Sequence, residues 1–448
     1  MKIVEKAAKP KSVEKKRYSF TKFRMGGDAV PAVDGDTLVA SCGWNCEAGN
    51  GLNANNVVTE FANKGVVAGK GDQSFTVGKV GAEKICYINT SGDCFLVVND
   101  TFTKKGTGYV RSKIVECVGK DGTKRVVLCG WHGVSIFDGE TFSKISETPT
   151  FYAAYAGERL FLVGEDNVVR YSAPLDENDF SLSADDGGFF AVDFRFGKII
   201  DMEEYDGSLY LFSALGISRL EVRGAARDFS LKSVHYDGKS ISTNTAARCD
   251  KGVCFLAEDG VYLCSGLTTK KLLDVRNFNV SKDYAWSKAI CSNGQYFVRV
   301  SVDGLDCTLA VHLNNGQASL LNVWEAIGKG FGYPLFANGE KFGGLFNDRL
   351  LAANSLESFL MGYTFTVDKF EICTAGEQAT FERMDFCGRG ALTVVVSNGK
   401  EEKSFRVALE DGEPIFVRLK GNRFSLTFTL DAGAELERVD IATEKLKR

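Results

Sequence analysis

Histidine is the side chain most often used as a general base near neutral pH, and this chain of 448 residues has three of them. His132, His235 and His312 lie far apart in the sequence. His132 follows Trp131 in the run CGWHG, a context that favours a structural histidine over a general base. The sequence also has no GxSxG elbow, phosphate-binding loop or HExxH pair. We therefore predict no catalytic residues and no enzymatic activity.

Thirteen cysteines could in principle supply thiolates to a metal or to disulfides. Their number is odd and their spacing does not repeat. Many, such as Cys129 in VVLCGW and Cys254 in VCFL, lie in apolar strand-like runs where a small buried thiol is common. Cys42 and Cys46, in CGWNC, are the closest pair and could begin a zinc site, but no second pair accompanies them. We predict reduced, structural cysteines, with no metal and no cofactor.

Two acidic segments could offer oxygen ligands to calcium. They are PLDENDF, from Pro174 to Phe180, and SADDGG, from Ser183 to Gly188. Neither reproduces the alternating ligand spacing of a dedicated calcium loop, which favours solvated turn acids instead. The 33 phenylalanines lie in strand-like runs, where burial explains them, and no basic-aromatic pattern calls for a nucleic-acid groove.

Composition limits the class of protein. Hydrophobic residues make up 44% and charged residues 25%, which is typical of a globular chain, and the net charge of −4 gives no overall attraction to nucleic acid or membrane. No apolar run approaches the roughly 20 residues that span a bilayer. The basic N-terminus has no apolar segment behind it, so we expect synthesis in a cytoplasm without secretion and no membrane partner.

The N-terminal segment is predicted to stand apart from the packed domains. Residues 1–24 carry nine Lys and Arg against two Glu, which favours a solvated, mobile tail. An arm that reaches a nucleic acid or an acidic neighbouring subunit is the alternative. Residues 26–70 are rich in Gly, Asn and Asp and continue as an extended lead-in, so that 1–70 forms one basic N-terminal region.

Three similar segments occupy the middle of the chain. In each, a polar turn precedes two apolar runs that are joined by a second turn, as in a β-hairpin. The first runs of the three segments are LFLV, LYLF and VCFL, and the second are VVRY, ISRLEV and VYL. Their bounds are Leu160 to Val163 and Val168 to Tyr171, Leu209 to Phe212 and Ile217 to Val222, and Val253 to Leu256 and Val261 to Leu263.

The turn glycines of these segments recur at a long period. Gly157, Gly207, Gly252, Gly294 and Gly339 are separated by 50, 45, 42 and 45 residues. A four-stranded propeller blade has a period of about 40–50 residues. Residues 71–360 are therefore predicted to form a β-propeller of six or seven blades.

After residue 360 the pattern changes to strands about 10–12 residues apart, as in an antiparallel sandwich. Hardly any helix is expected: only 322–328, and residues next to Ala247, could hold one or two turns. The predicted fold is all-β, a β-propeller followed by a C-terminal antiparallel β-sandwich over 361–448. Its strands are expected at 365–372, 379–387, 391–397, 403–409, 415–419, 423–430 and 436–441.

The central phrases GERLFLVGEDNVVRYSAPLDENDFS, DGSLYLFSALGISRLEV and CDKGVCFLAEDGVYLCSG occur in an order that resembles a known family. It is similar to β-propeller virion proteins of tailed bacteriophages, of the packaged-DNA stabilisation and tail-nozzle type. The C-terminal stretch VRLKGNRFSLTFTLDAGAELERVDIATE resembles their closing sandwich strands. The resemblance covers about residues 130–275 and 365–445.

The resemblance implies a structural virion protein. Several copies would form a homo-oligomeric ring below the portal, in the neck or tail nozzle, and would help to retain and channel the packaged DNA. The partners would be the portal or an adaptor and other tail proteins, with DNA passing nearby without specific contact. The virion would be assembled in the cytoplasm of the bacterial host.

Other functions stay open at this stage. A phage baseplate or receptor-binding module, or a cellular β-propeller scaffold, is the second hypothesis. A propeller hydrolase is the third, and it would need acids or histidines that the blade register brings together around a channel. Blade count, ring symmetry and the position in the neck or tail also stay open.

Overall fold

We describe the chain from a computed structural model. Its described residues are 13–25, 31–40, 42–44, 46–54, 58–60, 76–80, 84–88, 92–98, 101–110, 112–182, 187–192, 194–274, 289–292, 294–302, 305–314, 316, 318–321, 336–338, 341–346, 349–353, 363–374, 376–431 and 433–446.

Strands and turns make up almost all of this part of the chain, and the predicted all-β class is confirmed. The helical exceptions among the described residues are two short 3-10 helices, η1 (Phe194–Phe196) and η2 (Ala226–Asp228). The helical turn expected next to Ala247 is wrong, because Ala247 begins a strand. The other expected turn, at 322–328, lies outside the described residues.

The chain divides into two compact units. Unit 1 comprises Met1–Asn55, Gln317–Leu320 and Leu360–Arg448, and unit 2 comprises Asn56–Gly316 and Leu321–Phe359. From the sequence, the expected divisions were 1–70, 71–360 and 361–448. The structure instead groups most of the expected N-terminal region with the C-terminal strands.

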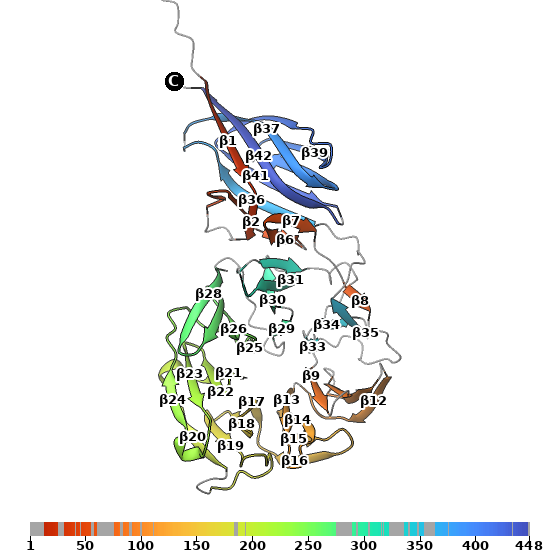
Figure 1. Ribbon diagram of the computed structural model, residues 1–448, viewed down its shortest axis with the longest axis vertical. Helices are drawn as coiled ribbons and strands as arrows, with labels where there is room; N and C mark the ends of the chain where they lie inside the picture. Colours follow the sequence, from red (N-terminus) through yellow and green to blue (C-terminus); the bar gives the residue numbers. More distant parts are fainter. Residues whose placement is uncertain are drawn as a thin grey trace, which may run out of the picture. The chain divides into compact units, whose positions relative to one another are not determined.

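Unit 2 is built from small antiparallel sheets that follow one another along the chain (Figure 1). In the first five, each strand pairs with the next one in sequence. They are β9 (Thr76–Val80), β10 (Lys84–Ile88), β11 (Cys94–Val98) and β12 (Thr101–Gly106); β13 (Lys113–Val118), β14 (Lys124–Gly130), β15 (Gly133–Phe137) and β16 (Phe142–Ser146); β17 (Thr150–Ala156), β18 (Arg159–Gly164), β19 (Val168–Tyr171) and β20 (Gly188–Ala191); β21 (Ile199–Tyr205), β22 (Ser208–Ser213), β23 (Gly216–Glu221) and β24 (Ser230–Ser233); β25 (Ala247–Cys249), β26 (Gly252–Ala257), β27 (Gly260–Ser265) and β28 (Thr268–Asp274).

Two further sheets of unit 2 lie later in the chain. One contains β29 (Ile290–Ser292), β30 (Gln295–Val302) and β31 (Leu305–His312). The other contains β33 (Phe336–Asn338), β34 (Lys341–Phe346) and β35 (Arg349–Ala353), and its fourth strand is β8 (Val58–Glu60) from the N-terminal side of the whole series. The last sheet therefore joins the two ends of unit 2.

Neighbouring sheets contact each other through their first strands. β9 contacts β13, which contacts β17, and the series continues through β21, β25, β29 and β33. Separate apolar clusters fill the spaces between successive sheets, from the first to the fifth. In one of them Phe212 of the fourth sheet packs on Phe255 of the fifth, with ring centroids 5.3 Å apart. Packing between sheets, in addition to hydrogen bonding within them, thus stabilises this unit.

The predicted hairpins are confirmed as the second and third strands of these sheets. The strands β18 and β19, β22 and β23, and β26 and β27 match the expected apolar runs to within one or two residues. Gly157, Gly207 and Gly294 lie between the first and second strands, with φ values of 52°, 66° and 69°, whereas Gly252 begins the second strand β26. A side chain would be strained in that conformation, which explains the recurrence of glycine. Gly339 lies outside the described residues.

Unit 1 contains two larger sheets and one small sheet. The first large sheet has the order β40-β37-β42-β7-β6, with β1 paired to β42, and the second includes β5-β36-β41-β38-β39; β2, β4 and β3 form the small sheet. The strand bounds are β1 (Val13–Phe20), β2 (Lys22–Met25), β3 (Val33–Asp34), β4 (Thr37–Ala40), β5 (Cys42–Trp44), β6 (Cys46–Gly49), β7 (Gly51–Ala54), β32 (Ala318–Leu321), β36 (Tyr363–Glu371), β37 (Ala379–Arg389), β38 (Ala391–Ser397), β39 (Glu402–Ala408), β40 (Ile415–Gly421), β41 (Arg423–Leu430) and β42 (Glu435–Leu446).

The two large sheets of unit 1 share a single hydrophobic core. Buried and partly exposed residues alternate along β38 and β41, as expected for strands with one face against a core. Phe365 of one sheet and Phe381 of the other are fully buried in the same cluster. The seven strands expected after residue 360 are confirmed.

The mobile tail expected for residues 1–24 is wrong for its described part. β1 pairs antiparallel with β42 along its whole length, from Val13 opposite Leu446 to Phe20 opposite Val439. Phe20 is fully buried in the core of unit 1, and Arg17 donates to the carboxylate of Asp440 at 2.9 Å. Two of the basic side chains in this part, Lys15 and Arg17, pair with Glu444 and Asp440 of β42.

Candidate functional site

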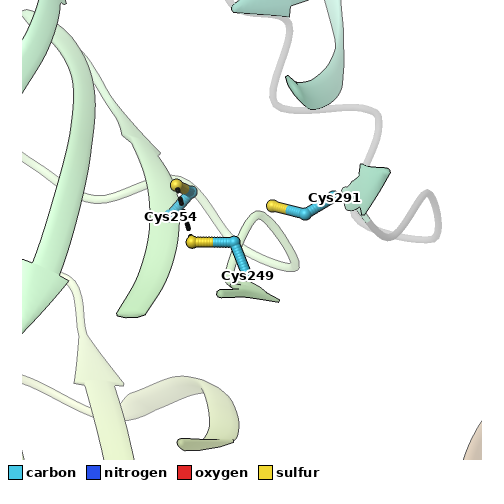
Figure 2. Close-up of side chains that lie close together, drawn as sticks. All are labelled: Cys249, Cys254 and Cys291. Carbon is cyan, nitrogen blue, oxygen red and sulfur yellow. Dashed lines mark hydrogen bonds between the residues drawn. The ribbon is translucent and has the colours of Figure 1, made fainter. Parts of the chain in front are cut away.

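Three cysteines of unit 2 form the one group of potential metal ligands found among the described residues. Cys249 ends β25, Cys254 lies on β26, and Cys291 lies on β29 of the neighbouring sheet. Their sulfur atoms all lie within 4.8 Å of one another. Figure 2 shows the sulfur of Cys291 directed toward the other two. The group thus joins the first two strands of one sheet to the first strand of the next.

The sulfur atoms of Cys249 and Cys254 are 3.9 Å apart, which is a hydrogen-bonding distance for thiols and well beyond a disulfide bond. The thiols of Cys254 and Cys291 hydrogen-bond to Cys249 and hold its pKa well below the usual thiol range. The backbone N–H groups of Lys251 and Gly252, in the turn after β25, act in the same direction. Cys249 is thus the thiol that this geometry favours as a thiolate.

The pKa values of the other two thiols move in the opposite direction. The hydrogen bond to Cys249 raises the pKa of Cys254, and burial adds to the increase. The hydrogen bond to Cys249 also raises the pKa of Cys291, whose Sγ contacts the carbonyl oxygen of Ala247 at 3.6 Å. Chemically, the group can share one negative charge among three sulfurs, ligate a soft cation, or lose two electrons to form a disulfide.

Cys254 was expected to be a structural cysteine, and this group was not predicted from the sequence. A signal was present in the repeat. Cys249 and Cys291 each precede the turn glycine of their own segment, Gly252 or Gly294, by three residues. Equivalent positions on the first strands of successive sheets lie side by side, so the repeat register predicts that these two thiols meet.

A buried charged group connects the first strands of several sheets nearby. Asp201, on β21, is 1% exposed and accepts from Lys113 Nζ, on β13, at 2.9 Å. Its other oxygen accepts from the N–H of Ala246, just before β25, at 3.0 Å. Lys113 also lies 4.8 Å from the ring centre of Tyr152, on β17. The network spans four successive sheets and neutralises its own charge inside the fold.

The structure does not bring the three histidines together, because each belongs to a different part of unit 2. His132, in the turn between β14 and β15, contacts Ser112 Oγ through Nδ1 at 3.1 Å and packs edge-on against Tyr109. Burial lowers the pKa of His132, so the ring is neutral near pH 7. His235 is exposed after β24, and His312, on β31, contacts Gln295. These surroundings fit the structural role expected for His132.

The acidic loop from Pro174 to Phe180 is described, and its carboxylates are engaged within the fold. Glu177 is buried and accepts from Arg125 of the preceding sheet at 2.5 Å. Asp176 pairs with Lys120, and Asp179 accepts from the N–H of Ser181. The expectation of solvated turn acids is therefore wrong for Glu177, which links two sheets. The second acidic segment, Ser183 to Gly188, lies mainly outside the described residues, as do the side chains of Cys42 and Cys46.

Comparison with known proteins adds little to this geometry. No protein-family model matches the chain, and no curated protein matches its sequence. Among solved structures, a computationally designed protein, Ika8, has a TM-score of 0.38 and 11% identity, and covers 64% of this chain and 98% of its own. BamB from Moraxella catarrhalis has a TM-score of 0.39 and 12% identity, and covers 68% of this chain and 93% of its own. At such TM-scores neither likeness bears on the fold or the function.

The described part of the chain has no helix with the length and apolar character needed to cross a membrane.

Proposed function

We propose that unit 2 is a seven-bladed β-propeller and that unit 1 is an antiparallel β-sandwich. The series of contacts between first strands, from β9 to β33, is what the inner strands of a propeller make. β8 completes the last sheet with a strand from before the first sheet, which is how a ring of blades can be closed. The shared core of the two large sheets in unit 1 supports the sandwich.

The function proposed for this architecture is structural. The protein forms a homo-oligomeric ring in the neck or tail nozzle of a tailed-phage virion, below the portal. There it helps to retain and channel packaged DNA. Buried ion pairs in unit 2 are the observation that supports a structural role. The buried carboxylates of Glu177, Asp201 and Asp259 each form an ion pair with an arginine or lysine of the same unit. Two of these ion pairs link different sheets and the third lies within one sheet, an arrangement that suits a rigid scaffold.

The outer strands offer a surface for subunit contacts. β20 is the last strand of its sheet, so one edge carries backbone groups that another chain could pair with. Phe189 on this strand is 60% exposed, whereas Phe190 packs against the core between the third and fourth sheets. Among the described residues, an unpaired strand edge and an exposed phenylalanine therefore occur together at β20. In the proposed ring, β20 lies at a subunit contact.

Electron microscopy of the purified full-length chain tests the ring, and mass spectrometry of purified virions tests the location. Rings of fixed symmetry, and the protein in stoichiometric amounts in virions, are expected. Phe189→Ser should weaken ring formation without lowering the unfolding temperature. The matched variant Phe190→Ser should lower that temperature because it removes a core side chain.

Two results would contradict the proposal. The first is a chain that stays monomeric at every concentration tested and is absent from virions. The second is a strongly basic inner surface in a reconstructed ring, because such a surface would hold passing DNA by its phosphates. A monomer that binds a host surface molecule would instead favour the second hypothesis, a receptor-binding module.

A further inference from the structure

We infer that Cys249, Cys254 and Cys291 form a binding site for one thiophilic closed-shell cation, Zn(II) or Cu(I), which fastens two neighbouring sheets of unit 2 together. This inference stands apart from the proposed function, since it depends only on the three side chains and the strands that carry them. It also applies to any assembly state of the chain.

Distance is the first argument for the site. Thiolates that share one zinc ion have metal–sulfur bonds of about 2.3 Å, which places the sulfur atoms roughly 3.8–4.0 Å from one another. The sulfur atoms of Cys249 and Cys254 are 3.9 Å apart. All three sulfurs lie within 4.8 Å, so Cys291 needs a shift of less than about an ångström to complete the group. A side-chain torsion can supply that movement.

The surroundings of Cys249 are the second argument. The N–H groups of Lys251 and Gly252, in the turn that follows Cys249, lower the pKa of its thiol. Such donors favour a thiolate over a thiol, and outer hydrogen bonds of this kind orient and stabilise metal-bound ligands. The turn that provides them is fixed by the hairpin between β25 and β26, where Cys249 lies opposite Gly252.

Burial decides what kind of ion suits the site. Cys254 is fully buried and Cys249 nearly so, while Cys291 is partly exposed. Thiolates in such a place are costly without a cation, and soft sulfur ligands select Zn(II) or Cu(I) over magnesium or calcium. The described residues supply three ligand atoms. Three sulfurs alone suit Cu(I), and Zn(II) takes a water molecule from the exposed side of Cys291 as the fourth ligand.

The ion would act between sheets. Cys249 and Cys254 belong to the fifth sheet and Cys291 to the next, so one ion connects strands that are not hydrogen-bonded to each other. The ion binds the folded chain and raises its free energy of unfolding, by an amount that grows with the logarithm of the ion concentration above the dissociation constant. Uptake releases the thiol protons to solvent, so the affinity rises with pH.

Titration of the reduced, metal-free, full-length protein with Co(II) tests the site, because thiolate–cobalt charge transfer gives a near-ultraviolet absorption band. One Co(II) per chain is expected, displaced by one Zn(II). A parallel titration with Cu(I) distinguishes the two ions, and uptake of either supports the site. Both ions should raise the midpoint of thermal unfolding.

Variants then assign the ligands. Cys249→Ala and Cys254→Ala should weaken binding by more than about 100-fold, since each removes a ligand that no neighbour replaces. Cys264→Ala is the matched control: this cysteine is equally buried in the same sheet but lies outside the group, so its removal should leave the affinity unchanged. Cys291→Ala, at a partly exposed position, gives a ligand variant with little loss of core packing.

The inference fails if the reduced wild-type protein, with its thiols verified by titration, takes up no Co(II), Zn(II) or Cu(I). It also fails if Cys264→Ala abolishes binding to the same extent as Cys249→Ala. Poor folding of a ligand variant does not affect either test. The metal-uptake test uses the wild-type chain alone. The comparison of variants depends on Cys264→Ala, whose folding is checked by circular dichroism.

Discussion

Asp259 shows how a single turn residue can hold a sheet. It lies between β26 and β27 and is 8% exposed. Burial alone would raise its pKa, but donation from Lys271, from the N–H of Lys239 and from the hydroxyl of Tyr262 outweighs burial and lowers the pKa to about 2. The carboxylate therefore binds these partners over the whole neutral range.

This shift predicts a pH dependence of stability. A carboxyl whose pKa is lower in the folded than in the unfolded chain adds stability that is present above the unfolded pKa and is lost as the pH falls toward the folded pKa. For Asp259 the window runs from about pH 4 down to about pH 2, and the loss is about 2 kcal/mol.

Urea unfolding of the wild type and of Asp259→Asn, at several pH values, measures this contribution. The wild type should be more stable at pH 6, and its advantage should shrink by about 2 kcal/mol by pH 2. Asn keeps the shape but not the charge, so the other carboxylates cancel in the comparison. An advantage that is the same at both ends of the window would show that the charge of Asp259 contributes nothing.

At the scale of strands, burial explains which strands could be predicted from the sequence. The second strands β22 and β26 are buried at every position, so each one is a short apolar run in the sequence. The outer strand β24 is mostly exposed, and the first strand β25 has three residues. Polar or short strands give no periodic signal, so the sequence located the hairpin of each of these sheets and not its first and last strands.

β1 is a strand that was expected to be a mobile tail. Its sequence VEKKRYSF has charges on both faces, and only Phe20 is fully buried, so it resembles a solvated tail. Its partner β42 lies 423 residues away at the contact of Arg17 with Asp440. No local pattern carries that information. The three-cysteine group had a signal only once the repeat register was applied, because each thiol alone looks like a small buried side chain.

The network around Asp201 makes a prediction about how first strands are held together. Asp201→Asn leaves the ammonium of Lys113 without its buried counter-charge and weakens the link between β13, β21 and β25. Breaking one partner of a buried pair costs about 3–5 kcal/mol. A lower midpoint in urea unfolding, monitored by circular dichroism, is expected.

Asp206→Asn is the matched control for this network. Asp206 is in the turn after the same strand, its side chain is 75% exposed, and its φ of 50° is one that Asn tolerates. Its substitution should change stability by less than about 0.5 kcal/mol. In a double variant, Lys113→Met should cost less in the Asp201→Asn background than alone, since the pair is already broken. Equal costs in both backgrounds would mean that the two residues act independently.

For the whole of unit 2, the decisive element is β8, because it brings the N-terminal side of the series to its last sheet. It pairs antiparallel with β35, with Val58 opposite Ala353 and Thr59 opposite Ala352. In such a pair, neighbouring residues of an edge strand point their N–H groups alternately toward and away from the partner. Proline removes an N–H, so it is harmful at one of these positions and tolerated at the other.

Val58→Pro and Thr59→Pro therefore form a pair of variants in which one is the control for the other. The harmful variant separates β8 from β35. If unit 2 is a ring closed by β8, amide hydrogen exchange should become faster in β35. It should also become faster in β9, where the series of sheets begins. A linear stack of sheets would confine the effect to β35. If both prolines leave exchange in β35 unchanged, β8 does not close the unit, and the proposed propeller loses its main support.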